Sequence, residues 1–227
     1  MSDSVSYPGT SGEAVPPTAA AADPYLARML AGDEAALAAC FAVERPRLAR
    51  MVQFRLDPRL RGRVDAEDVL QEAYVAAAQR LSALRDVQPM SPLVWFRLIV
   101  GQTLIDLHRR HVGAQMRNAE RERSIQARLA DGTSMTMTFH LLGRFTSPSN
   151  AAVRAEMSEL LTSALEAMNE TDREVLALRH FEELTNKETA EVLGIEPKAA
   201  SIRYVRALAR LKETLQSVPG FFDADGK

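Results

Sequence analysis

Apolar residues recur every three or four positions along most of this chain, which is the spacing of one face of an α-helix. No segment shows the strict apolar–polar alternation that is typical of a half-buried strand. The pattern therefore predicts an all-α protein. The segments with helical spacing are approximately residues 25–41, 47–56, 65–84, 92–128, 150–168, 171–181, 185–193 and 197–215.

Short polar residues mark the start of several of these helices. Three predicted starts pair a capping side chain with an acid three positions later: Asp65 with Asp68, Thr171 with Glu174, and Thr185 with Glu188. Ser91 followed by Pro92 predicts another start, and Gly194 stands where the C-cap of a short helix belongs. These signals indicate the helix boundaries independently of the apolar spacing.

Residues 130–150 break the helical spacing, because turn-forming residues there are mixed with isolated apolar ones. An irregular segment of this length is longer than most connections inside a compact domain. We therefore predict two small helical domains joined by a flexible linker. The predicted boundaries are a disordered tail at 1–24, a first domain at 25–128, the linker at 129–149, a second domain at 150–216 and a C-terminal tail at 217–227.

The composition, with 46% hydrophobic and 26% charged residues, is that of an ordinary globular protein and excludes a fully disordered chain. The single cysteine, Cys40, cannot form an internal disulfide or a metal site built from several cysteines, and it suits a reducing cytosol. The longest apolar stretch, residues 93–107, contains charged residues and is too short to span a bilayer. We therefore expect a cytoplasmic protein with no membrane partner.

The net charge of −2 conceals an uneven distribution along the chain. Residues 197–212 carry five basic side chains and no acid, whereas residues 156–196 carry three basic and eleven acidic side chains, a net charge of −8. A helix-sized cationic block favours nucleic acid binding, because the local potential and not the net charge neutralises phosphates. The acidic block is expected to face away from DNA or toward a basic protein partner.

Residues 185–211 predict two unequal helices separated by about three residues that include a glycine, which is the helix-turn-helix pattern. A helical wheel of the second helix gives a cationic face formed by Ala199, Arg203, Arg206 and Arg210. A separate stripe is expected to pack on the domain, formed by Ile202, Val205, Leu208 and Ala209. The cationic face suits the DNA major groove, and the alternative is the solvated basic face of an ordinary helix.

Two segments of the first predicted domain carry polar surfaces. Residues 65–81 predict an amphipathic helix, and the same pattern also fits a plain surface helix with acids near the positive end of its dipole. Residues 95–123 combine Trp95 and Phe96 with a series of arginines, which suits contact with unpaired strands. The alternative there is that both aromatic residues belong to the core and that the arginines pair with neighbouring glutamates.

Together these segments resemble the sigma-70 family of bacterial RNA polymerase initiation factors, and more narrowly its two-domain extracytoplasmic-function group. Region 2.2 of that family, which docks on the clamp helices of the polymerase β′ subunit, is similar to DAEDVLQEAYVAAAQRL. Regions 2.3 and 2.4, which melt and read the minus-ten element, are similar to WFRLIVGQTLIDLHRRH. Region 4, which reads the minus-thirty-five element, is similar to residues 169–211. The resemblance covers about residues 25–216.

The resemblance implies roles for particular residues. Those that match polymerase-binding positions are Asp68, Gln71 and Glu72. Those assigned to DNA contact in the first domain are Gln102, Asp106, Arg109, Arg110 and Arg117. Those assigned to DNA contact in the recognition helix are Lys198, Ala199, Ser201, Arg203, Arg206 and Arg210. Ala199 and Ala200 stand where many relatives have Thr-Val, and Gln102 stands where many have Asn, so the base preference is not carried over.

The resemblance implies core RNA polymerase (β′ clamp and β flap) and promoter DNA as partners, allows an anti-sigma factor as another, and implies no cofactor. The alternative is a LuxR-type helix-turn-helix regulator, whose pattern fits residues 169–195 nearly as well. Such a regulator would carry an α/β receiver or a ligand-binding domain upstream, and residues 25–124 show no alternating strands. An enzyme is disfavoured, because the four histidines are scattered and no catalytic or metal-ligating constellation accompanies them.

Overall fold

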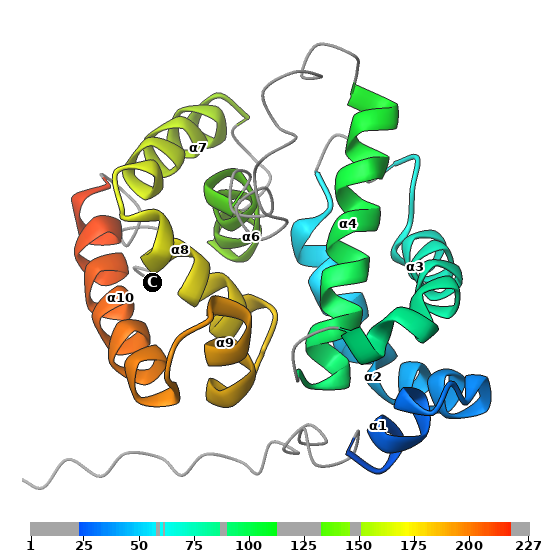
Figure 1. Ribbon diagram of the computed structural model, residues 1–227. Coiled ribbons are helices and arrows are strands. Elements are labelled where there is room, and N and C mark those ends of the chain that lie inside the picture. Colours follow the sequence, from blue (N-terminus) through cyan, green and yellow to red (C-terminus); the bar gives the residue numbers. More distant parts are fainter. Residues whose placement is uncertain are drawn as a thin grey trace, which may run out of the picture.

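The computed structural model describes residues 23–57, 60, 62–86, 90–112, 133–145 and 151–218, and all regular structure in these residues is helical. This confirms the all-α prediction. The elements in chain order are α1 (Asp23–Leu30), α2 (Glu34–Arg55), α3 (Ala66–Arg80), a 3-10 turn η3 (Leu81–Asp86), α4 (Pro92–Val112), α6 (Thr133–Phe145), α7 (Ala151–Glu166), α8 (Glu170–Leu176), a π turn η5 (Ala177–Phe181), α9 (Asn186–Leu193) and α10 (Pro197–Ser217) (Figure 1).

Helices α1 to α4 surround one hydrophobic core, in which the ring of Phe41 meets that of Phe96 edge to face at 5.1 Å. The sequence predicted two helices in residues 25–56 with a break at about 42–46, and the position of that break is wrong. The break lies between α1 and α2 instead, and α2 continues through Pro46. Proline removes one backbone hydrogen bond and strains the turn before it. Apolar side chains before and after Pro46 are buried in the same core, and their packing keeps the helix continuous.

Helices α6 to α10 surround a second core, to which Phe54 of α2 also contributes. The sequence predicted a linker without regular structure at 129–149, and this is wrong over α6. Met137 and Leu142 of α6 are buried in the second core, and the hydroxyls of Thr138 and Thr162 are 3.0 Å apart. Threonine-rich segments have low helix propensity, so packing against α7 and α2 stabilises this helix where local preference does not.

The predicted capping boxes at Asp65 and Thr185 are both present, and Gly194 ends α9 in the left-handed conformation with φ of 63°. The predicted cap at Thr171 is wrong. Asn169 caps α8 instead, because its Oδ1 accepts a hydrogen bond from the Thr171 backbone N–H at 2.9 Å. The Glu174 side chain cannot complete a box, since it is buried and bound to Arg55.

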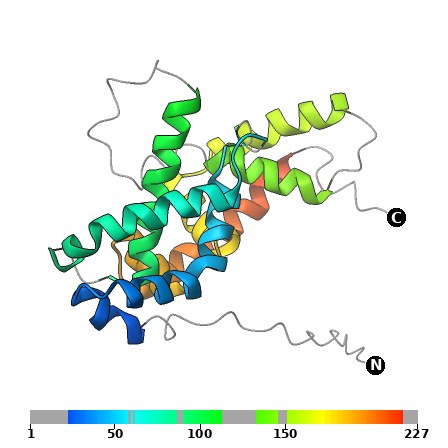
Figure 2. The same ribbon diagram turned by 90° about the vertical axis from the view of Figure 1, so that its right-hand side faces the viewer.

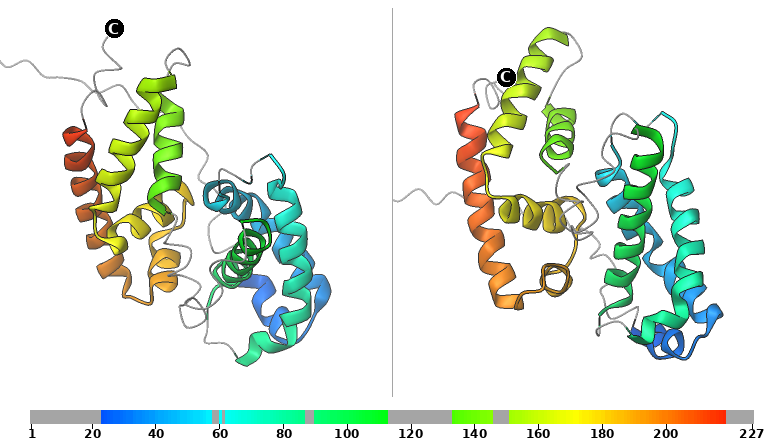
Figure 3. Two further views of the ribbon diagram at one scale, coloured as in Figure 1. Left: turned by 90° about the horizontal axis from the view of Figure 1, so that it is seen from above. Right: turned by 45° about the horizontal axis from the view of Figure 1, so that its top comes forward.

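The two groups of helices lie side by side, with α2 and α4 of the first facing η5 and α9 of the second (Figure 3). Figure 2 views the molecule from the side of the first group, with the second behind it. Among the described residues, no helix is both long enough and apolar enough to cross a membrane.

Candidate nucleic-acid and polymerase interfaces

The outer face of α3 presents the three side chains that the sequence assigned to polymerase binding. Asp68, Gln71 and Glu72 are all exposed, as predicted. Two of them also have structural roles. The Asp68 carboxylate accepts a hydrogen bond from the backbone N–H of Asp65 in the capping box, and Glu72 forms an ion pair with Arg110 of α4. Asp68 and Glu72 therefore stabilise the structure through these contacts, in addition to any contact with a partner.

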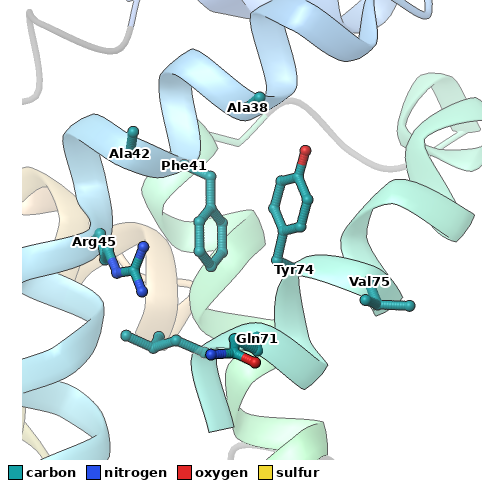
Figure 4. Close-up of a pocket in the computed structure, with 8 residues that line it drawn as sticks. Ala38, Phe41, Ala42, Arg45, Gln71, Tyr74 and Val75 are labelled. Carbon is teal, nitrogen blue, oxygen red and sulfur yellow. The ribbon is translucent and has the colours of Figure 1, made fainter. Parts of the chain in front are cut away.

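A hollow of about 400 Å³ lies beside this face, between α2 and α3 (Figure 4). Its floor includes Phe41 and Tyr74, whose rings meet edge to face at 5.2 Å. Gln71 and Val75 also line it, and Val75 is 54% exposed. Sequence reasoning missed this hollow, although an apolar Val75 on an otherwise polar helix face was a visible signal.

The second half of α4 gathers four of the five residues assigned to DNA contact in the first domain. The Gln102 amide donates to Asp106 Oδ1 at 2.8 Å, and an Arg109 nitrogen lies 3.9 Å from the same oxygen. Arg110 donates to both carboxylate oxygens of Glu72 at 2.7 and 2.8 Å. These polar groups orient one another along α4. Arg117 lies outside the described residues.

The aromatic residues that precede this surface do not belong to it. Trp95 and Phe96 are buried in the first core, which confirms the part of the alternative that concerns these two rings. The predicted pairing of the arginines with neighbouring glutamates falls on residues outside the described ones. Neither ring can stack on an unpaired base without leaving the core. Any contact with single-stranded DNA at α4 in this arrangement would therefore involve its polar residues.

Helix α10 packs on α8 and α9 through a narrow stripe that includes Ala200, Ala207 and Leu211. The sequence predicted that a different stripe faces the domain, and this is wrong. Ile202, Val205 and Leu208 are among the exposed large hydrophobic residues, and Ala209 is also exposed. Two of the three buried residues are alanines, whose small apolar surface does not mark a buried face in the sequence.

Most residues assigned to DNA contact on α10 are accessible, but their positions differ. Lys198, Ala199, Ser201 and Arg206 are exposed. Arg203 is half-buried at the edge of the packing stripe, and Arg210 forms an ion pair with Asp172 of α8. Arg206 is therefore the arginine of the predicted cationic face that is both exposed and free of ion pairs with other described residues.

Two buried arginines of the first helix group bind two buried glutamates of the second. Arg55 Nε donates to Glu182 Oε1 at 2.6 Å, and its NH2 donates to Glu174 Oε1 at 2.7 Å. Arg97 Nε donates to Glu182 Oε2 at 2.8 Å. Burial alone would raise the pKa of Glu182, but the charges of Arg97 and Arg55 outweigh it and hold that pKa below its ordinary value.

A further buried pair, Arg47 of α2 and Glu188 of α9, extends this contact. Burial would raise the pKa of Glu188, but the hydrogen bonds from Arg47 and the Thr185 backbone lower it overall. Burial raises the pKa of the neighbouring Glu44. Rings also cross the contact, since Phe54 stacks on Phe181 with centroids 4.8 Å apart.

Part of the acidic block therefore faces a basic protein surface of the same chain, because Glu174, Glu182 and Glu188 bind arginines of the first helix group. The sequence predicted that residues 156–196 face away from DNA or toward a basic protein partner, and it did not indicate which basic surface would meet them. Each arginine of the contact lies in a helix that also has ordinary core positions, so its apolar spacing gave no sign of a buried charge.

Comparison with known families identifies both groups of helices. The sigma-70 region 2 family matches residues 41–113, and the sigma-70 region 4 family matches residues 158–211. The chain belongs to the sigma-70 family. It falls in the extracytoplasmic-function (ECF) group, because its relatives include ECF sigma factors. As a sigma factor, the protein binds core RNA polymerase and directs promoter recognition and transcription initiation.

The relatives of this sigma factor include the ECF RNA polymerase sigma factor SigD of Mycobacterium tuberculosis, 28% identical over 194 residues, which cover 85% of this chain and 83% of that protein. SigW of Bacillus subtilis is 24% identical over 73% of this chain and 83% of its own. The probable sigma factor RfaY of Xanthomonas campestris is 29% identical over 66% of this chain, but over only 34% of its own length. The structure of CnrH in complex with the cytosolic domain of CnrY is 22% identical with a TM-score of 0.47, over 91% of this chain and 99% of that one.

The LuxR-type alternative is not supported, because the sigma-70 region 2 family occupies the part of the chain where such a regulator would carry a receiver or ligand-binding domain. Sigma factors are initiation factors and not enzymes. Within the described part of the chain, no group of three His, Cys, Asp or Glu side chains is arranged to hold a metal ion.

Proposed function

We propose that this sigma factor divides promoter recognition between its two helix groups. In this division, the second half of α4 reads and melts the minus-ten element and the outward face of α10 reads the minus-thirty-five element. The outer face of α3 and the hollow beside it bind the polymerase β′ clamp. The accessible cationic face of α10 is the observation that carries the proposal.

The charge of α10 supports DNA as its ligand. From Pro197 to Lys212 the helix has five basic residues and no acid. The side chains of Lys198, Arg203 and Arg206 form no hydrogen bond or ion pair with other described residues, so they remain available to phosphates and base edges. Pro197 begins the helix, and helix-turn-helix proteins contact bases with residues near this end.

The geometry of α4 supports a different role. Gln102 and Asp106 are held by a hydrogen bond to each other, and Asp106 carries a negative charge that would repel phosphates. Such groups suit the recognition of base edges more than the gripping of a backbone. Arg109 and Arg110 at the end of the helix supply the positive charge for adjacent phosphates.

The experiment is promoter binding by holoenzyme reconstituted from core polymerase and the full chain. Arg206→Ala should weaken binding by about 1–3 kcal/mol at promoters with the preferred upstream element and relax selection there. Arg28→Ala, which removes an exposed arginine of α1, is the control and should leave binding unchanged. Binding that ignores Arg206 at every promoter would remove the DNA-reading role from α10.

The protein acts in the cytoplasm, because core RNA polymerase and the chromosome are there, and it performs no catalysis of its own. An anti-sigma factor is a candidate regulator, and pull-down of a partner that displaces core polymerase would identify one.

A further inference from the structure

The face of α10 that points away from the domain combines positive charge with large apolar side chains. Ile202 is 45% exposed and Val205 is 63% exposed. Both lie on the side of the helix opposite the buried stripe that includes Ala200 and Ala207. These two aliphatic side chains do not pack in the core, and they lie together on a cationic face that a partner outside the domain can cover.

We propose that Ile202 and Val205 recognise the 5-methyl groups of thymines in the upstream promoter element. The inference rests on the proposed function, in which α10 enters the major groove. In that groove, the thymine methyl is the only apolar group that a base edge presents. An aliphatic side chain offers no hydrogen bond to the other edges, so it favours thymine where it meets a base.

The positions of the two side chains fit adjacent base pairs. Ile202 and Val205 are three residues apart, which separates them by about 4.5 Å along the helix axis. Successive base pairs rise by about 3.4 Å. Both residues lie in the N-terminal half of α10, the part of a recognition helix that reaches deepest into the groove.

The charges around the two side chains favour DNA over a protein as their partner. Arg206 lies beside them and is exposed, Lys198 lies one turn before Ile202, and the segment has no acid as far as Lys212. A protein that covered this face would have to desolvate these cations or supply acids for each of them. The phosphates on both sides of a DNA major groove already carry the negative charges that neutralise these cations.

The test uses holoenzyme with a duplex that carries the preferred upstream element, in which deoxyuridine replaces thymidine one position at a time. Deoxyuridine lacks only the 5-methyl group. With the unmodified sigma factor, substitution at one or two positions should weaken binding about three- to fivefold, which corresponds to the burial of one methyl group. Ile202→Ala and Val205→Ala should each remove the sensitivity at one position.

Matched variants separate this recognition from other effects. Val205→Thr keeps the shape of the side chain and one methyl group, so it should retain part of the sensitivity. Arg206→Ala should weaken binding to thymidine and deoxyuridine duplexes by the same factor. Because the substituted side chains are exposed, the variants should keep the helix content of the unmodified protein, which circular dichroism can check.

Three outcomes would overturn the proposal. If Arg206→Ala weakens binding but every deoxyuridine duplex binds normally, α10 reads DNA without using these methyl groups. If neither change affects binding, the assignment of α10 to the upstream element fails as well. If Ile202→Ala and Val205→Ala instead weaken holoenzyme assembly and leave the thymidine preference unchanged, the apolar face is a protein-docking surface.

Discussion

Arg47 and Glu188 are 141 positions apart in the chain, and their side chains form a two-point ion pair with N–O distances of 2.9 and 2.6 Å. The Arg47 side chain is 5% exposed and that of Glu188 is 1% exposed. Removing two charges from water costs free energy that only good geometry and further hydrogen bonds offset. Glu44 and the Thr185 backbone supply such bonds here, so the pair specifies how the two helix groups dock.

This pair predicts a coupling that a double-mutant cycle can measure. Arg47→Met leaves two buried glutamates without their cation and should lower the free energy of unfolding by about 3–5 kcal/mol. Glu188→Gln keeps the capping box, which accepts Gln, and should cost about 1.5–3 kcal/mol. The double variant should be more stable than the sum predicts by about 0.5–3 kcal/mol in urea unfolding. Strict additivity would mean that the two residues do not interact in solution.

The same contact predicts a dependence of stability on pH. The pKa values of Glu182 and Glu188 are lowered in the folded protein, so both carboxylates stabilise it at neutral pH. Unfolded glutamate has a pKa of about 4.3 and takes up protons first as the pH falls. The urea midpoint should therefore decrease from about pH 6 toward about pH 4. Glu44, whose pKa burial raises, acts in the opposite direction and reduces the slope.

Glu182→Gln is the variant that identifies the source of this slope. It removes one of the two carboxyl groups whose pKa is lowered by folding. The urea midpoint of the variant should therefore be lower at neutral pH, and it should decrease less as the pH falls from about 6 to about 4. A variant with an unchanged slope would show that other groups cause the acid sensitivity.

The hollow between α2 and α3 predicts an apolar contribution to holoenzyme assembly. Val75→Asp places a charge in its lining, and we expect it to weaken core polymerase binding at least tenfold. Gln79→Asp makes the same kind of change one turn further along α3, outside the hollow, and should bind normally. Size-exclusion chromatography with core polymerase would distinguish them, and equal binding by both would contradict a docking role for the hollow.

The acidic residues of α3 need a subtler test than charge reversal. Reversing the charge of Glu72 would also break its ion pair with Arg110. Because Arg110 is assigned to DNA contact, a loss of activity could then come from weaker polymerase binding or from weaker DNA binding. Asp68→Asn keeps an oxygen that can accept the Asp65 hydrogen bond while it removes the charge. A loss of holoenzyme with intact helix content would support direct contact of Asp68 with polymerase, and normal assembly would assign Asp68 to the helix terminus alone.

The contact between the helix groups should open when the promoter is bound. The minus-ten and minus-thirty-five elements are about 25 base pairs apart, or about 85 Å, whereas a compact chain of 227 residues has a radius of gyration of only about 17 Å. Dyes on cysteines introduced at Gln79 and Glu213 should lose energy transfer when core polymerase and promoter are added. Burial raises the pKa of the Cys40 thiol to about 12, so the native cysteine should not react with the dyes. Unchanged transfer in a transcribing complex would contradict opening.

The helices whose packing is local could be predicted from the sequence. Capping boxes mark the starts of α3 and α9, at Asp65 and Thr185. The left-handed Gly194 marks the end of α9, before α10. All these signals come from neighbouring residues. Helix α6 could not be predicted in this way, because its stability comes from α7 and from Phe54, far away in the chain.

In the candidate sites, too, the sequence predicted features that depend on neighbouring residues and not those that depend on distant ones. Exposure of Asp68 and Gln71 followed from the helical period, whereas the face of α10 did not, because Ala200 and Ala207 carry too little apolar surface to mark a buried stripe. The buried arginines could not be predicted, since a charge becomes a core residue only when a distant partner such as Glu182 meets it.

In the proposed division of labour, one chain reads two promoter elements with two separate helices. Run-off transcription with core polymerase can measure this on promoter libraries that are randomised separately in the upstream and the downstream element. The unmodified sigma factor should select sequences in both libraries, Arg206→Ala should relax selection only upstream, and Gln102→Ala should relax it only downstream. Selection lost in both libraries with either variant, or no initiation with this chain at all, would contradict this division of labour.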